Sequence, residues 1–247
     1  MTTRFFLYTK QDGYSVQDIT GCQILNPASY AGTILLYPEE SIDNHYNNAI
    51  LEGSLIEWCK EFCSKDGIFL DIGAHTGSYA VCLSPNCKEV YAFEPCRRNY
   101  YGLCGSVALS NRQNIQCFQL AIGSPEQLNG GVLYIKNENG EDSSLHNNEP
   151  EKVIRTEEVD IITLDTFFNN KPIDSAIQFI KIDVEGNELE VLQGAVDTLK
   201  QHNYPKIVFE RNSDESKQKR LLDFLNNDLG YYTQPITGYA HMYLATR

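Results

Sequence analysis

The sequence predicts an α/β fold with a mostly parallel sheet of seven strands. Short apolar runs alternate with amphipathic segments at helical spacing, and several of these runs end in an acid. Such alternation is typical of parallel strands joined by crossover helices. Two further apolar stretches near the C-terminus, Tyr231–Thr233 and His241–Thr246, predict an antiparallel strand pair at one edge of the sheet.

The elements are expected in a regular order. An amphipathic helix is predicted over 43–64, where Leu51, Leu55, Trp58 and Phe62 recur at steps of three and four residues. The parallel strands are expected at 69–72, 89–93, 115–121, 177–183 and 205–210, with additional strands at 131–136 and 159–164. Helices are expected at 77–83, 97–110, 164–168, 187–199 and 216–229.

The chain divides into an N-terminal arm or extension over 1–42 and an α/β domain over 43–247. Short apolar alternations such as Arg4–Tyr8 and Thr33–Tyr37 predict a few short strands in the arm. The polar segment Asn137–Lys152 is long for a structureless loop, and loops of that length inside compact domains are usually functional or disordered.

Composition argues against a polyanionic partner. The chain of 247 residues carries a formal charge of −13, and its short basic runs, Arg97-Arg98 and Lys217 to Arg220, are flanked by polar residues. We therefore expect no nucleic acid partner. The oligomeric state stays open, with a homodimer among the options.

The cysteines and the N-terminus favour a cytoplasmic protein. None of the eight cysteines forms a CxxC pair, and no histidine follows them at zinc-finger spacing. The first residues lack the apolar core of a signal peptide, and no apolar run approaches the length of a membrane span. Reduced thiols and no membrane span are therefore expected.

A glycine-spaced turn marks a cofactor site. Residues 69–77 read FLDIGAHTG, so that Gly73 and Gly77 surround a tight turn between a strand and a helix. A dinucleotide site would carry three glycines around a pyrophosphate, and the Asp71 carboxylate would repel that group. An acid here favours a ligand with an ammonium group, such as S-adenosylmethionine (SAM).

A second acid supports SAM. Glu94 ends the next predicted strand, roughly 20 residues after the turn, where a carboxylate is placed to accept hydrogen bonds from ribose hydroxyls. The pair of acids on consecutive strands is harder to obtain by accident than either acid alone.

A third block of acids follows at 181–188. Asp183 and Glu185 lie at the end of a core strand, and Glu210 ends the next one. If the strand continues to Glu185, both side chains project to the same side. Like charges gathered at one edge need a neutralising cation, which could be SAM, Lys181 or a divalent metal.

With these motifs the chain resembles FkbM-type SAM-dependent methyltransferases. The resemblance covers roughly residues 66–246, and its most specific string is FIKIDVEGNELEVLQG at 179–194. The other matching segments are FLDIGAHTG at 69–77, YAFEP at 91–95, TLD at 163–165, KIVFE at 206–210 and Ser143-Ser144-Leu145. It implies a Rossmann-like methyltransferase fold and O-methylation of a hydroxyl on a sugar, glycan or small molecule.

The resemblance also implies roles for individual residues. Asp71, Gly73, Ala74 and Gly77 would line the methionine part of SAM, with His75 in the same turn. Glu94 and Pro95 would hold the ribose, while the loops at Ala121 and Ser144 would border the adenine and the acceptor. Asp183 would also contact the cofactor.

For catalysis, Asp183 and Glu185 are predicted as base or metal ligands, with Glu210 third and Lys181 tuning them. His75, inside the cofactor turn, and His146, in the long polar loop, are alternative bases, and a local backbone role is favoured for His75. A divalent metal is not itself predicted. Two other functions stay open: methylation of RNA or protein on the same fold, and a SAM-binding module without catalysis.

Overall fold

A seven-stranded sheet forms the centre of the molecule. The computed structural model describes residues 7–9, 14–19, 22–27, 34–36, 52–128, 130–137, 140 and 142–247. The strand order is β14-β15-β13-β12-β5-β6-β7, and β15 runs antiparallel to both β13 and β14 while the other pairs are parallel. The bounds are β5 Ile68–Ile72, β6 Glu89–Phe93, β7 Ile115–Phe118, β12 Ile177–Ile182, β13 Lys206–Glu210, β14 Tyr232–Ile236 and β15 Tyr239–Thr246. The predicted fold class is confirmed.

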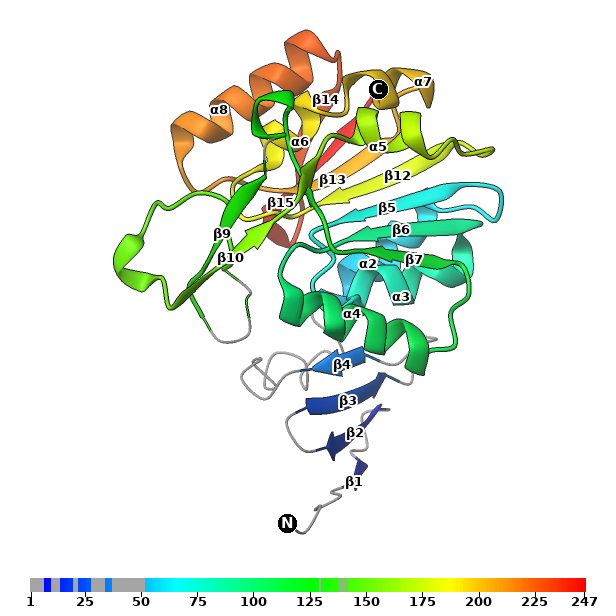
Figure 1. Ribbon diagram of the computed structural model, residues 1–247. Coiled ribbons are helices and arrows are strands. Elements are labelled where there is room, and N and C mark those ends of the chain that lie inside the picture. The colour runs from blue at the N-terminus through cyan, green and yellow to red at the C-terminus, as the bar shows by residue number, and fades with distance from the viewer. Residues whose placement is uncertain are drawn as a thin grey trace.

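Helices cover both faces of this sheet (Figure 1). One face carries α2 (Gly53–Cys59), α3 (Ser78–Leu83) and α4 (Arg97–Leu109), and the other carries α5 (Leu164–Asn170), α6 (Glu188–Gln193), α7 (Val196–Gln201) and α8 (Glu215–Asp223). Phe69 packs in the first core cluster and the adjacent Leu70 in the second, because successive strand residues face opposite sides. None of the helices in the described part of the chain is long and apolar enough to cross a bilayer.

A smaller antiparallel sheet precedes the α/β domain. Its strands are β1 (Leu7–Thr9), β2 (Tyr14–Ile19), β3 (Cys22–Pro27) and β4 (Ile34–Leu36), in that order. The short strands expected in the arm are therefore present. Ile34 is fully buried in the same core cluster as Leu55 and Val81, so β4 contributes to the main core. The expected boundary between residues 42 and 43 lies outside the described residues, as does the start of the helix predicted over 43–64.

The helix predicted over 187–199 is two helices. The chain breaks at Gly194 between α6 and α7, because Gly194 packs directly on the 121–124 segment: a Cβ there would lie 2.0 Å from the Gly123 carbonyl oxygen. Asp165 then caps α7 by accepting hydrogen bonds from Asp197 N (3.1 Å) and Thr198 N (2.7 Å).

Two predicted strands are also divided. The stretch 115–121 becomes β7 and β8 (Ala121–Ile122), and the stretch 159–164 becomes the end of β10 (Arg155–Val159) followed by β11 (Ile161–Ile162). Strands β8 and β11 pair with each other, while β10 pairs with β9 (Gly131–Ile135) in a separate antiparallel ribbon. The remaining short helical turns are η1 Lys60–Phe62, η2 Ser84–Asn86, η3 Pro125–Gln127, η4 Pro150–Lys152 and η5 Phe224–Asp228.

We predict that Gly73→Ala lowers the free energy of unfolding by at least about 3 kcal/mol. Gly73 has φ +79°, and a Cβ there would lie 1.7 Å from the Asp183 carbonyl oxygen, so the backbone would have to shift. Gly238 is the matched control: it has φ +87° with nothing within 4 Å of a Cβ, and Gly238→Ala should cost only about 1 kcal/mol. Urea denaturation followed by circular dichroism measures both, and equal costs would contradict the close approach.

Candidate active site

A cavity of about 310 Å³ opens at the carboxyl ends of the parallel strands β5, β6, β12 and β13. This is the edge at which open α/β sheets bind ligands. Ten of the predicted site residues line it: Gly73, Ala74, His75, Glu94, Pro95, Ala121, Lys181, Asp183, Glu185 and Glu210. The predicted residues include most of the acidic and basic side chains among the described residues that line the cavity.

The glycine turn is built onto the neighbouring strand. The backbone N–H groups of Gly73 and Ala74 both donate to the Phe93 carbonyl oxygen at 3.0 Å. His75, with φ +48°, turns its own N–H toward Glu94 and donates to Oε2 at 2.9 Å. The turn after β5 and the acid after β6 are thus one hydrogen-bonded unit.

Glu94 is a buried carboxylate with acceptor capacity to spare. It is 6% exposed, and its Oε1 accepts a hydrogen bond from Cys96 N at 2.9 Å. Burial raises the pKa of Glu94 to about 7, although the two backbone N–H groups lower it. A carboxylate offers about four lone-pair sites, so those left over can accept hydroxyl protons from a ligand in the cavity.

Asp71 does not line the cavity, contrary to the expectation that it would contact the cofactor. It is fully buried; Oδ2 accepts a hydrogen bond from Ala80 N at 2.9 Å, and Oδ1 lies 3.8 Å from Lys181 Nζ. Burial raises the pKa of Asp71 to about 6, against the lowering effect of Lys181. Asp71 anchors the start of α3 because its side chain points to that face of the sheet.

Gly77 also lies outside the cavity wall. It is the residue before α3, with φ +97°, and a Cβ there would come within 2.8 Å of Leu103 Cδ1. Its position lets α3 pack closely on α4.

Lys181 joins the two central strands at the site. Its buried Nζ donates to the Gly73 carbonyl oxygen at 2.8 Å and lies 3.2 Å from Asp183 Oδ2. Burial alone would lower the pKa of Lys181, but Asp183 and Asp71 outweigh it and hold the pKa above its ordinary value. The ammonium therefore stays charged and fixes Asp183 beside the glycine turn.

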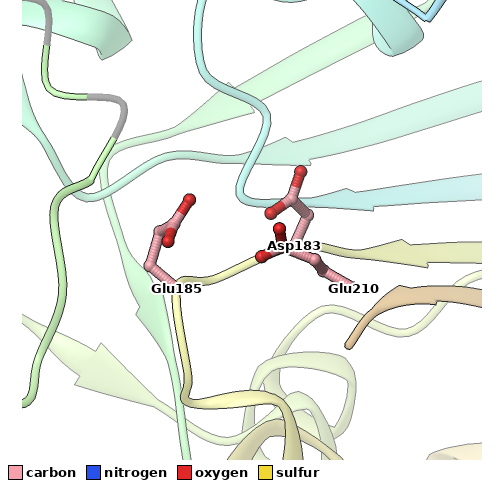
Figure 2. Close-up of side chains that lie close together, drawn as sticks. All are labelled: Asp183, Glu185 and Glu210. Atoms are coloured by element: carbon pink, nitrogen blue, oxygen red, sulfur yellow. The ribbon is translucent and has the colours of Figure 1, made fainter. Parts of the chain in front are cut away.

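Asp183 also lies close to two further carboxyl groups, those of Glu185 and Glu210. Figure 2 shows Asp183 and Glu185 on the turn after β12 and Glu210 at the end of β13, and one oxygen of each lies within 4.8 Å of the others. Burial and the charge of Asp183 raise the pKa of Glu185 to about 8. The same two causes raise the pKa of Glu210 well above its ordinary value. Carboxylate oxygens at this spacing could share a proton or hold a hard cation.

The strand ends before Glu185, so strand alternation does not place Asp183 and Glu185 on the same side. β12 ends at Ile182, and Glu185 and Gly186 have φ of +53° and +99°. A left-handed turn, rather than strand alternation, brings Glu185 toward Asp183. Local strand periodicity could not have shown this.

Ser144 supports that turn instead of lining the cavity. Its hydroxyl donates to the Glu185 carbonyl oxygen at 2.7 Å, and its neighbours Ser143 and Leu145 form the wall. His146 also lies outside the wall, and its N–H donates to Ser144 Oγ at 3.2 Å. The loop borders the cavity through Ser143 and Leu145, and the roles expected for Ser144 and His146 stay predictions.

The sequence missed Glu52, Tyr79 and Asn99, which all line the cavity. Glu52 precedes α2 with φ +55°; its Oε2 accepts a hydrogen bond from Tyr79 Oη at 2.8 Å, and its Oε1 lies 2.9 Å from His241 Nε2. Asn99 lies in the first turn of α4 and is 1% exposed. No motif spacing connects Glu52 to the glycine turn, whereas a polar residue inside a buried first turn was a weak available signal for Asn99.

Comparison with known proteins identifies the family. The Methyltransferase FkbM domain matches residues 71–232, which include the glycine turn, Glu94 and all three converging acids. A curated relative, Methyltransferase 1 of Beauveria bassiana (strain ARSEF 2860), is 23% identical over 188 residues, covering 70% of this chain and 71% of the relative.

The structure was also matched to solved methyltransferase structures at low identity. A putative methyltransferase from Streptococcus mutans in complex with SAH is 14% identical with a TM-score of 0.46, covering 77% of this chain and 94% of that one. A putative O-methyltransferase from Klebsiella pneumoniae is 10% identical with a TM-score of 0.47, covering 78% of this chain and 77% of that one.

The strand order, the cavity at the carboxyl edge and the domain match agree with the resemblance seen in the sequence. The chain belongs to the FkbM methyltransferase family and is a SAM-dependent methyltransferase.

Proposed function

We propose that this enzyme methylates a hydroxyl oxygen of a sugar or other small-molecule acceptor. The observation that carries the proposal is the group of carboxylates Asp183, Glu185 and Glu210 around one end of the cavity. A hydroxyl is a weak nucleophile, so its methylation benefits from a group that takes its proton.

Asp183 is placed to accept that proton. Lys181 Nζ lies 3.2 Å from Asp183 Oδ2, while burial and the charge of Asp183 raise the pKa of Glu210. We therefore assign proton removal to Asp183 and keep Glu210 in its protonated form. Glu185, with a pKa of about 8, can hold the acceptor through a second hydrogen bond in either protonation state.

The residues of the cavity suit SAM. Glu94 offers acceptor sites for ribose hydroxyls, the acids beside Gly73 balance a cationic ligand, and Asn99 Oδ1 is a buried acceptor without a hydrogen-bond partner among the described residues. SAM supplies a methyl group on an already activated sulfonium. What the protein adds is position and the removal of one proton.

The charge of the wall favours an uncharged or amino-bearing acceptor. Glu52 adds a fourth carboxyl group to those of Asp183, Glu185 and Glu210. Lys181 is the only Lys or Arg among the described residues that line the cavity, and it is already paired with Asp71 and Asp183. A phosphate or carboxylate would face these acidic groups beside an ammonium that is already paired. The same argument, with the net charge of −13, disfavours nucleic acid.

We also propose a cytoplasmic location. The seven cysteines whose side chains the structure describes are all free thiols, and four of them are buried while three are half-buried. Free thiols are typical of reducing compartments.

The first prediction concerns the cofactor. S-adenosylhomocysteine (SAH) should bind roughly tenfold more weakly at pH 6 than at pH 8, because Glu94, with a pKa of about 7, loses acceptor capacity when it is protonated. Glu94→Gln should bind SAH at least about tenfold more weakly at pH 8, with a shallower pH trend. Isothermal titration calorimetry measures both.

The exposed Glu126→Gln variant is the control for this measurement and should bind like the wild type. Equal affinity and an unchanged pH trend in Glu94→Gln would remove Glu94 from the cofactor site. Absence of any SAH binding by the folded wild type would contradict the cofactor assignment itself.

The second prediction concerns the base. Asp183→Asn should lower kcat by about 10²–10³ while SAH affinity stays within about threefold, because the lost group acts on the acceptor proton. The assay measures SAH release with neutral sugars as acceptors. EDTA should leave wild-type activity unchanged, because the Lys181 ammonium already stands beside Asp183. Activity lost to EDTA and restored by Mg²⁺ would instead make the three acids a metal site.

The third prediction concerns acceptor charge. Neutral or amino sugars should be methylated with kcat/KM at least about tenfold above that of their phosphorylated counterparts, because the wall is acidic. Glu52→Gln, which removes one carboxylate but keeps its size, should narrow that ratio. A preference for phosphorylated acceptors or for RNA would contradict the proposed acceptor class.

A further inference from the structure

A fully buried acid lies directly behind the carboxyl groups of the cavity. Glu188 is the first residue of α6 and is 1% exposed, and it is not among the described residues that line the cavity. An acid at the start of a helix usually needs no further explanation than the helix dipole. A carboxyl group buried this far needs hydrogen-bond donors, however, so its partners indicate what it does.

Two N–H groups of the turn that carries Glu185 donate to this buried carboxyl group. Glu188 Oε1 accepts hydrogen bonds from Val184 N at 3.2 Å and from Gly186 N at 3.1 Å. Its Oε2 has no partner among the residues that the structure describes. The two donors lie on either side of Glu185 in the sequence. One oxygen therefore closes the turn between β12 and α6, much as the acid of a capping box reaches back to an N–H group before its helix.

The peptide group between Glu185 and Gly186 is held at both of its polar atoms. Its N–H donates to Glu188 Oε1, and its carbonyl oxygen accepts a hydrogen bond from Ser144 Oγ at 2.7 Å. These two contacts fix the orientation of the peptide group. They also hold Glu185 at φ +53°, a left-handed conformation that residues with a side chain rarely adopt. The direction in which the Glu185 side chain leaves the backbone thus depends on Glu188.

This contact needs the oxygen of Glu188 and does not need its charge. Burial raises the pKa of Glu188 to about 7, against the lowering effect of the backbone N–H groups. The carbonyl oxygen of a protonated carboxyl group still accepts hydrogen bonds, and so does the oxygen of an amide. A glutamine at this position would turn its oxygen toward the two N–H groups, because its own NH₂ would oppose them.

We propose that Glu188 is a positioning residue for methyl transfer, which sets the Glu185 carboxyl group against the acceptor by holding the turn 184–186. Glu185 lines the cavity and points toward Asp183 (Figure 2), whereas Glu188 acts on the reaction only through this turn. A displacement of about 1 Å at a reacting site can cost on the order of 10²-fold in rate. The inference rests on the proposed function, in which Glu185 holds the acceptor.

The test measures kcat/KM of the full chain with a neutral sugar acceptor, and SAH affinity by isothermal titration calorimetry. Glu188→Met keeps the length of the side chain but removes the oxygen. It should lower kcat/KM on the order of 10²-fold while SAH affinity stays within about threefold. Glu188→Gln keeps the oxygen and should stay within about tenfold of the wild type.

A double-mutant cycle separates positioning from general support of the fold. In a Glu185→Ala background, the further loss caused by Glu188→Met should shrink to about threefold or less, because the side chain that it positions is gone. The control is Glu190→Met, which changes a half-buried acid of the same helix and should leave kcat/KM within about threefold in either background.

A second variant covers the case in which circular dichroism shows that Glu188→Met does not fold. Ser144→Ala releases the other end of the same peptide group and should show the same coupling to Glu185.

Three results would overturn the inference while the proposed function stands: losses that multiply in the double variant, a loss of SAH affinity equal to that of kcat/KM, or a Glu188→Gln enzyme as impaired as Glu188→Met. A Glu185→Ala enzyme as active as the wild type would instead remove Glu185 from the acceptor site. That result would overturn this part of the proposed function together with the inference.

Discussion

The buried ammonium of Lys181 is the contact on which the rest of the site depends. Nζ lies between Asp71 and Asp183, at 3.8 and 3.2 Å, and donates to the Gly73 carbonyl oxygen at 2.8 Å. A buried charge is tolerated only when it is paired and hydrogen-bonded. Lys181 meets both conditions, and in doing so it joins β12 to the turn after β5.

This arrangement explains why two acids at the ends of neighbouring strands have different roles. Asp71 is fully buried, accepts a hydrogen bond from Ala80 N and lies beside the Lys181 ammonium, so its contacts are structural. Asp183 shares the same ammonium but remains partly exposed and faces Glu185 and Glu210. The Lys181 ammonium is thus paired with one carboxylate inside the core, Asp71, and with a second one in the cavity wall, Asp183.

The sequence predicted what depends on strand ends and little of what depends on turns. The acids Glu94, Asp183 and Glu210 lie in the cavity because parallel strands finish at the same edge, which apolar runs reveal directly. Ser144 and Gly77 match the family motifs equally well, yet they hold the backbone and lie outside the cavity wall. A motif match shows that a residue type is needed, and only the packing around it shows whether a ligand or the protein needs it.

The remaining misses involve contacts between distant segments. Gly194 breaks a helix because of its approach to Gly123, and Glu52 reaches the cavity through Tyr79 and His241, which belong to α3 and β15. No periodicity within either segment encodes such a contact. Composition alone could therefore place these residues in elements but could not place their side chains.

The segment between β9 and β10 borders both ends of the cavity. Gly140 O accepts the hydrogen bond from Asn99 at one end, and Ser144 Oγ donates to Glu185 O at the other. Ser144 is in turn bridged to Tyr134 of β9, so both contacts originate from one short stretch fixed to one strand. The positions of the Glu185 backbone and of the Asn99 amide are consequently set by the same piece of backbone. The segment between β9 and β10, which the sequence predicted to border the adenine and the acceptor, thereby contacts residues at both ends of the cavity.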